Sequence, residues 1–252
     1  MYHTCRYMMV IHSGVLTVLL IILACLVYME MGFQSVLSDD LNPGLYSPNS
    51  NPYGTSFAKW TEKWWQWFIQ IPTENIVHPL DDRDGKSCGI NQEGPVWYLP
   101  GANGEVTRSC TIPAGKAILF PVLNAEFSEL EEHTPSEKDL RNKAISENNV
   151  PEPQLLATID GYEIKDIKEN YRVTSGLFNV TFPKNNVFGV ELENDTRTIA
   201  VSDGWFIMLE PLKPGLHHLY FNGQQVSQAS FMQPGADNKN TVIKVNYSLT
   251  IE

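Results

Sequence analysis

The sequence lacks the features that mark several common classes of protein. It has 4 cysteines in 252 residues, too few for a small disulfide-rich scaffold. It has 18 Lys and Arg against 29 Asp and Glu, a formal charge of −11, and so lacks the basic excess that nucleic-acid binding requires. Charged residues make up 19% of the chain and hydrophobic residues 42%, which excludes a disordered acidic tail. We therefore expect a globular protein with no nucleic-acid partner.

Familiar catalytic and cofactor motifs are also missing. The chain has no G-x-S-x-G elbow, no P-loop, no G-x-G-x-x-G fingerprint and no H-E-x-x-H pair. Each of these motifs places a nucleophile, a phosphate or a metal at a fixed spacing, so their absence removes the sequence basis for those chemistries. The sequence therefore predicts no cofactor.

The amino terminus has no charged residue from Tyr7 to Met29. A helix that crosses the hydrocarbon layer needs ~20 residues, so this stretch is long enough to hold the protein in a membrane. Arg6 precedes it, which orients the remainder of the chain outward. We interpret residues 1–33 as a membrane anchor or signal segment; a cleaved signal peptide and a lipoprotein modified at Cys25 are the alternatives. All three place the remaining chain on the extracytoplasmic side of the cell membrane, or secrete it if the segment is cleaved.

Export changes how the cysteines are interpreted. Two of them fall within the N-terminal segment, which leaves Cys88 and Cys110 as the pair that an oxidising compartment would join. Export also makes N-glycosylation sequons relevant, and these are permissive signals only. Three are present, at Asn179, Asn194 and Asn246.

Two regions follow the N-terminal segment. Residues 34–56 are rich in Ser, Asn, Pro and Gly and predict a linker. Residues 57–252 predict an exported domain that is mainly β, an antiparallel sandwich or jelly roll with two added α-helices. Residues 243–251 alternate between apolar and polar side chains, which is typical of a half-buried antiparallel strand. Turns or strand ends are expected at residues 160–161, 202–204 and 222–223, which contain Asp-Gly or Asn-Gly.

The first predicted helix covers residues 57–71, FAKWTEKWWQWFIQI, in which apolar residues recur at three- and four-residue steps. Trp60, Trp64, Trp65 and Trp67 would stack on a glycan or lie in a membrane interface if they were exposed. The periodic stripe instead favours a helix packed on the main sheet.

A second helix is predicted from a capping box, with Thr134 as cap and Glu137 three residues later, and it extends to about residue 147. The preceding segment, EFSELEEH, predicts an acidic surface. Asn124 and Glu126 lie just beyond a predicted strand at residues 116–123, and they are the first polar pair to test if a pocket lies there. The turn at residues 81–85 is interpreted as a solvated acidic turn, because it lacks two ligands of a calcium loop.

Several motifs occur together: WWQW at residues 64–67, GPVWYL at 94–99, CTIPAGKA at 110–117, FPVLN at 120–124 and DGW with PLKPGLH at 203–217. In combination they resemble a family of uncharacterised exported proteins of bacteria and ammonia-oxidising archaea, with WWQW, GPVWFL, C-x-(I/V)-PAGKA and PLxPGxH motifs. The match spans roughly residues 57–250. The members have no assigned activity, so the resemblance implies export and the cysteine pair and adds no catalytic residue.

Three functional hypotheses remain. The leading one is a non-catalytic cell-surface module that binds a glycan or an envelope protein. The second is an exported hydrolase that uses Glu126 with a histidine, His217 being the candidate, because such pairs are matched in space and leave no motif. The third is a metal-binding exported protein with His78, His133 and His218 as candidate ligands.

Overall fold

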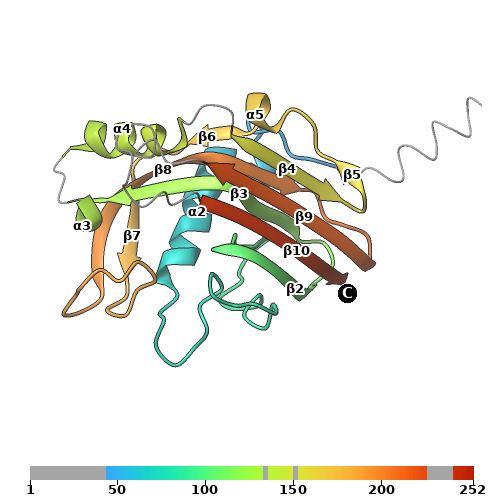
Figure 1. Ribbon diagram of the computed structural model, residues 1–252, viewed down its shortest axis with the longest axis horizontal. Coiled ribbons are helices and arrows are strands. Elements are labelled where there is room, and N and C mark those ends of the chain that lie inside the picture. The colour runs from blue at the N-terminus through green and yellow to red at the C-terminus, as the bar shows by residue number, and fades with distance from the viewer. Residues whose placement is uncertain (1–43, 133–135, 150–152, 226–240) are drawn as a thin grey trace, which may run out of the picture. The chain divides into compact units, whose positions relative to one another are not determined.

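Two β-sheets dominate the computed structural model, which describes residues 44–132, 136–149, 153–225 and 241–252 (Figure 1). The first sheet has the order β1-β3-β8-β6, and β7 also pairs with β8. Its strands are β1 (Val96–Tyr98), β3 (Ala117–Ser128), β6 (Arg172–Thr174), β7 (Phe178–Phe182) and β8 (Thr196–Leu209). The second sheet has the order β2-β10-β9-β4-β5. Its strands are β2 (Gly104–Ile112), β4 (Gln154–Ile159), β5 (Tyr162–Glu163), β9 (Gly215–Gln225) and β10 (Thr241–Ile251).

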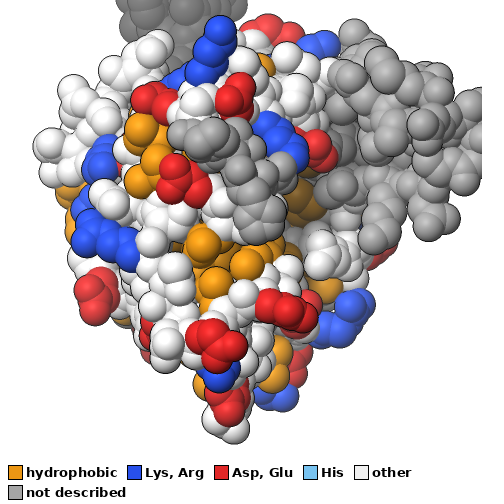
Figure 2. Space-filling view, turned by 90° about the vertical axis from the view of Figure 1, so that its left-hand side faces the viewer, with side chains coloured by type: hydrophobic (Ala, Val, Ile, Leu, Met, Phe, Trp, Pro, Cys, Tyr) orange, Lys and Arg blue, Asp and Glu red, His pale blue; other side chains and the backbone are white. Residues whose placement is uncertain are grey.

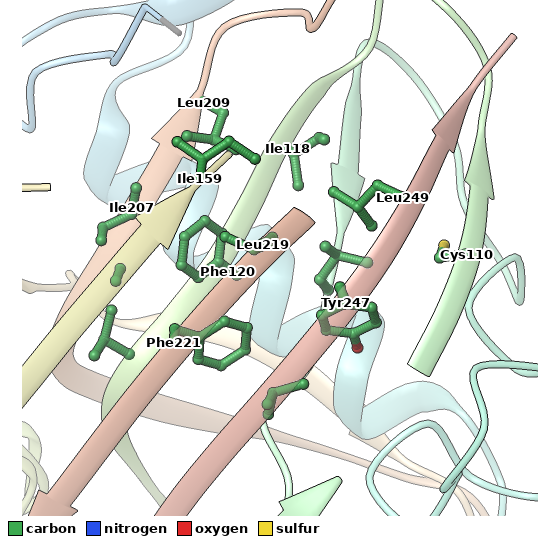
Figure 3. Close-up of a cluster of buried hydrophobic side chains, with 14 of the residues drawn as sticks. Cys110, Ile118, Phe120, Ile159, Ile207, Leu209, Leu219, Phe221, Tyr247 and Leu249 are labelled. Carbon is green, nitrogen blue, oxygen red and sulfur yellow. The ribbon is translucent and has the colours of Figure 1, made fainter. Parts of the chain in front are cut away.

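The inner faces of the two sheets enclose the main hydrophobic core. Phe120 on β3 and Phe221 on β9 come from opposite sheets, and their rings stack with centroids 4.9 Å apart (Figure 3). Ile207 and Leu249 are fully buried in the same cluster. The predicted mainly β sandwich is therefore confirmed. Two strand pairs are parallel, β1 with β3 and β2 with β10, so both sheets are mixed rather than purely antiparallel.

Helix α2 (Phe57–Gln70) covers the other face of the first sheet and buries a second core there. Ser56 caps it, since the Ser56 hydroxyl accepts a hydrogen bond from the Lys59 N–H. The four tryptophans Trp60, Trp64, Trp65 and Trp67 are at most 7% exposed. They therefore pack into the core, and no open ring face is left for a glycan or a membrane.

The remaining helices among the described residues are short additions to the sheets. They are the 3-10 turn η1 (Pro52–Gly54), α3 (Glu129–Glu132), α4 (Glu137–Asn148) and α5 (Ile167–Asn170). Helix α4 begins two residues later than predicted, because the Ser136 hydroxyl, rather than Thr134, caps it by accepting the Asp139 N–H. Thr134 itself lies outside the described residues.

Two of the expected turns lie inside strands. Strand β8 runs unbroken through residues 202–204, because Gly204 lets the neighbouring strand come close: a Cβ there would lie 2.6 Å from the Cα of Asn124. Strand β9 likewise continues through residues 222–223, since a Cβ on Gly223 would lie 2.0 Å from the carbonyl oxygen of Val122. The turn at residues 160–161 is confirmed, with positive φ at both positions.

The predicted membrane segment at residues 7–29 lies outside the described residues. Among those described, no helix combines the length and the apolar character needed to cross a bilayer. Within the predicted linker, residues 44–56 pack on the domain. The N–H of Tyr46 donates to the carbonyl of Met208, and the N–H of Glu210 donates to the carbonyl of Gly44.

Candidate functional site

Two loops meet below the sheets at the bottom of the view in Figure 1. One covers residues 71–95, between α2 and β1, and the other covers residues 183–195, between β7 and β8. The N–H of Thr73 donates to the carbonyl of Asn185 at 2.8 Å, and the Asn185 amide donates to the Glu74 carboxylate at 2.5 Å. We call residues 71–95 and 183–195 the paired loops.

The first of the paired loops folds around a buried aspartate. The Asp82 carboxylate accepts backbone N–H groups from Gly85 at 3.0 Å and Ser87 at 2.8 Å, and Asp82 is 4% exposed. The prediction of a solvated acidic turn is therefore wrong at this residue. Its carboxylate satisfies the donors of its own loop, which fixes the shape of the loop.

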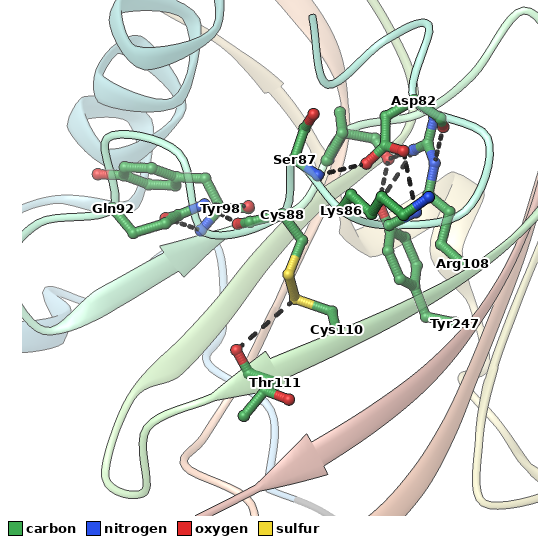
Figure 4. Close-up of a disulfide and its surroundings, with 12 residues drawn as sticks. Asp82, Lys86, Ser87, Cys88, Gln92, Tyr98, Arg108, Cys110, Thr111 and Tyr247 are labelled. Atoms are coloured by element: carbon green, nitrogen blue, oxygen red, sulfur yellow. Dashed lines mark hydrogen bonds between the residues drawn. A yellow bond between two sulfur atoms is a disulfide. The ribbon is translucent and has the colours of Figure 1, made fainter. Parts of the chain in front are cut away.

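A buried arginine, Arg108, holds the same loop against strands β2 and β10. Arg108 on β2 is 1% exposed, and its guanidinium donates to the carbonyls of Leu80, Asp82 and Gly101 at 3.1, 2.6 and 3.0 Å (Figure 4). It also donates to the Tyr247 hydroxyl on β10 at 3.0 Å. The planar fork of donors is thus used on several acceptors at once. Sequence reasoning missed this role, although Arg108 occupies one of the alternate inward positions of β2.

The predicted disulfide is confirmed. Cys88 in the first loop is bonded to Cys110 on β2, with their Cα atoms 5.8 Å apart (Figure 4). Cys110 is two residues from Arg108, so a covalent bond and the hydrogen bonds of a buried guanidinium hold neighbouring parts of the loop to one strand. The loop is therefore a fixed surface feature.

The paired loops carry exposed apolar side chains on this fixed base. Ile76, Val77 and Phe188 are 39%, 58% and 39% exposed. Beneath them the Phe68 ring contacts both loops, with its centroid 4.8 Å from that of His78 and 6.4 Å from that of Phe188. Aliphatic and aromatic groups at such exposure are typical of the centre of a binding surface.

Hollows flank these side chains. One of about 800 Å³ is lined by both loops, with Glu74, Lys184 and Glu193 among its polar groups. Another of about 440 Å³ lies beside Ile76 and Val77. The exposed residues of both loops include seven acidic and three basic ones. The surface is therefore apolar at its centre and acidic around it.

The histidines predicted as metal ligands have other partners. His78 is buried, its Nδ1 accepts the Leu80 N–H at 3.1 Å, and its Nε2 faces the Phe68 carbonyl at 3.0 Å. Burial lowers the pKa of His78, which keeps the ring neutral. His218 is exposed on β9, and His133 lies outside the described residues. In the described part of the chain no three or more His, Cys, Asp or Glu side chains gather as a metal site.

Glu126 and His217 are not brought together. Glu126 lies on β3 of the first sheet, whereas His217 lies on β9 of the second (Figure 1). The His217 ring is held by the Asp160 carboxylate at 2.7 Å and the Lys213 carbonyl at 2.8 Å.

Glu126 has a different neighbour, Glu131 of α3. Strand β3 continues to Ser128, so the segment predicted as an acidic surface begins inside the strand and Glu126 is 6% exposed. Burial raises the pKa of Glu126 well above its ordinary value, and the charge of the nearby Glu131 raises it further. Burial also raises the pKa of Glu131, while hydrogen bonds from Ser128 lower it. Of the two carboxyl groups, Glu126 therefore holds its proton the more tightly.

The predicted glycosylation sequons lie on strands or loops. Asn179 and Asn194 are exposed, and Asn246 is half-buried on β10. Their use stays a prediction.

Comparisons with known proteins identify no family. No family model matches the chain, and no curated protein matches it either. The solved structure of a cysteine protease inhibitor of Entamoeba histolytica, EhICP2, is similar at 12% identity and a TM-score of 0.22, covering 62% of this chain and 96% of that one. The structure of Amebosin is similar at 10% identity and a TM-score of 0.20, covering 64% of this chain and 100% of that one. PbICP-C, solved in complex with falcipain-2, is similar at 8% identity and a TM-score of 0.22, covering 63% of this chain and 100% of that one. Likeness at this level supports no functional argument, and the family resemblance of the motifs stays a prediction.

Proposed function

We propose that this protein is an exported, non-catalytic binding module that engages a partner protein through the paired loops. The observation that carries the proposal is the position of Ile76, Val77 and Phe188. Three of the seven large hydrophobic side chains that are exposed in the described residues lie on these two loops. Burying them against a partner removes apolar surface from water, which is the main favourable contribution to protein association.

The proposed export has its own support. A disulfide between Cys88 and Cys110 persists in an oxidising compartment and is rare in the cytosol. An N-terminal apolar segment at residues 7–29 supplies a means of membrane attachment. We accordingly place the β-sandwich on the extracytoplasmic side of a cell membrane.

The loops are suited to binding because they are ordered before any partner arrives. The disulfide, the Arg108 guanidinium and the Asp82 carboxylate all hold the first loop, and Asn185 holds the second loop to the first. A loop that is already fixed loses little conformational entropy on binding. This arrangement favours recognition by a preformed surface.

The chemistry of the surface indicates the kind of partner. Side chains such as Ile76 and Val77 bury area against other apolar side chains, which are found at the core of protein interfaces. The acidic excess around them would be matched by Lys and Arg on the partner, which raises the association rate at low salt. We infer a protein partner with an apolar patch and a basic border.

Site-specific photo-crosslinking tests the proposal. A photoreactive residue at Val77 of the membrane-attached protein should capture one envelope protein in cells. The same residue at Leu216, which is 63% exposed on another part of the molecule, is the matched control and should not capture it. The captured protein is then purified and its affinity measured.

Val77→Asp and Phe188→Ser should each weaken binding of the purified partner by roughly tenfold or more, the effect expected at the centre of an interface. Leu216→Asp should leave the affinity unchanged. Equal capture from both positions, or an affinity that only Leu216→Asp reduces, would refute the proposed surface. Binding of glycans alone would favour the glycan alternative.

A further inference from the structure

We propose that Glu126 and Glu131, together with the neutral oxygen groups of Ser202 and Asn124, bind a divalent cation of the oxygen-preferring kind, such as Mn²⁺, Mg²⁺ or Ca²⁺. This site is separate from the paired loops and independent of the proposed function.

The register of the first sheet places three of these side chains together. Glu126 on β3 and Ser202 on β8 are directly paired in the antiparallel ladder, so their side chains leave the sheet on the same face as close neighbours. Asn124 lies two residues before Glu126 on the same strand and therefore on that face as well. In the ladder Asn124 is paired with Gly204, which has no side chain to occupy the space beside Asn124.

Several polar atoms of this group have no hydrogen-bonding partner within the described part of the chain. They are both carboxyl oxygens of Glu126, the hydroxyl of Ser202 and the amide nitrogen of Asn124. Ser202 is 0% exposed, so water does not reach its hydroxyl from the surface. Buried polar groups are nearly always satisfied, so a set of adjacent exceptions marks a place where an ion can bind.

The fourth side chain comes from helix α3. Glu131 turns back toward the strand, and its Oε2 accepts hydrogen bonds from the Ser128 N–H at 3.1 Å and the Ser128 hydroxyl at 2.7 Å. Ser128 lies two residues beyond Glu126 on the same face of β3, so the carboxyl group of Glu131 lies beside that of Glu126. Lys143 of α4 is the basic group whose charge acts on Glu131, whereas the charge acting on Glu126 is that of Glu131.

Two carboxyl groups in contact inside a protein repel each other when both are ionised, and a positive charge between them removes that repulsion. Carboxylate, amide carbonyl and hydroxyl oxygens are the ligands that hard divalent cations prefer. For Asn124 to supply an oxygen, its amide group turns about its terminal bond. Water completes the coordination from the side of Glu131, which is only partly buried.

The end of the molecule that carries α3 and β7 has a hollow with hydrophobic side chains, and side chains of both charges stand around it (Figure 2).

The test uses the purified full-length protein, stripped with chelator and dialysed. Mn²⁺ is the first probe, because its electron paramagnetic resonance signal reports the free ion directly; Mg²⁺ and Ca²⁺ follow as competitors. We expect stoichiometric binding and a rise in Tm on addition of Mn²⁺. Glu126→Gln should weaken binding by roughly 10–100-fold, the range seen when a metal site loses a supporting group. The exposed acid Glu169 on α5 provides the matched control, and Glu169→Gln should bind Mn²⁺ as the wild type does.

Ser202→Ala gives a second, independent variant, since it removes one oxygen and little volume. It should lower the Mn²⁺ affinity several-fold while circular dichroism confirms the fold, and it carries the test if Glu126→Gln does not fold. The proposal is overturned if the folded wild type shows neither binding nor a Tm shift at millimolar Mn²⁺, Mg²⁺ or Ca²⁺. It is equally overturned if Glu126→Gln or Ser202→Ala binds Mn²⁺ as tightly as the wild type, because the cation would then be bound elsewhere.

Discussion

Arg108 and Tyr247 are register partners on the parallel strands β2 and β10, and the Arg108 guanidinium donates a hydrogen bond of 3.0 Å to the Tyr247 hydroxyl. The same guanidinium lies over the Tyr247 ring, 5.7 Å from its centroid. Burial raises the pKa of Tyr247 to about 12, so the hydroxyl keeps its proton and donates it to the Pro100 carbonyl at 3.3 Å. One buried cation therefore connects two strands and the first of the paired loops.

Arg108→Lys should destabilise the protein strongly although the charge is kept. A lysine ammonium has no planar fork and cannot reach the carbonyls of both Leu80 and Gly101, so buried acceptors lose their donors. We expect a loss of about 3 kcal/mol or more in the free energy of unfolding, measured by guanidinium chloride titration. The control is Arg83→Lys, at an exposed arginine with one bond to a carbonyl, which should cost less than about 0.5 kcal/mol. Similar losses in the two variants would contradict the anchoring role of Arg108.

Removal of the disulfide should also be costly. Cys88 and Cys110 are separated by 22 positions, and the loss of a link of that span lowers stability by about 3 kcal/mol in the chain-entropy model. Thermal melting of the wild type with and without reductant, beside the double variant Cys88→Ser and Cys110→Ser, measures this. Reductant should lower the Tm of the wild type and leave that of the double variant unchanged. A wild type insensitive to reductant under conditions that yield free thiols would argue against this prediction.

The raised pKa of Glu126 predicts a pH-dependent stability. The folded protein holds a proton on Glu126 that the unfolded chain releases above its ordinary pKa of about 4.3, so stability falls as pH rises from there to the raised value and is level beyond it. Glu126→Gln cannot ionise and should be more stable than the wild type at neutral pH. The two should converge near pH 4 when urea midpoints are compared from pH 4 to pH 8. In the Glu126→Gln variant, the raised pKa of Glu131 should still make stability fall with rising pH, but by less than in the wild type. Parallel curves across this range would mean that Glu126 ionises in the folded protein as freely as in the unfolded one.

Close packing of the two sheets makes Gly223 intolerant of a side chain. A Cβ there would lie 2.0 Å from the Val122 carbonyl oxygen, so backbone must move. Gly223→Ala should therefore cost at least about 1–3 kcal/mol in a urea titration, as overpacking does. Gly89 is the matched control, because no atom lies within 4 Å of its added Cβ, and Gly89→Ala should have little effect. Tolerance of both substitutions would show that the sheets separate here at low cost.

The accuracy of sequence-based prediction depends on whether the deciding contacts are local. Helix α2 could be predicted because its cap and apolar stripe lie within one segment. The same dipeptide, Asp-Gly, makes a turn at residues 160–161 and lies within strand β8 at residues 203–204. At the second position Asp203 is paired with Arg172 at 2.8 Å and bonded by Thr174 at 2.6 Å, contacts that no local pattern predicts.

Prediction of the binding surface depends even more on contacts in the tertiary structure. Ile76 and Val77 are residue types usually counted as core, and their exposure follows from how residues 71–95 are anchored by Arg108 and Cys110. Glu126 was predicted on an acidic surface, and it is buried because β3 extends five residues past the predicted strand end at Leu123. The cysteine pair could be predicted, because the other two cysteines fall within the N-terminal segment and the exported part contains two that can bond to each other.

The position of β10 between β2 and β9 has a consequence for biosynthesis. Arg108 and Tyr247 are 139 positions apart, so β2 leaves the ribosome long before its partner strand has been made. Until then the nascent chain has a free edge at β2, and the guanidinium lacks one of its acceptors. Pairing over such a distance is slow. The second sheet therefore closes late, and a nascent chain that carries β2 alone is the form most prone to aggregation.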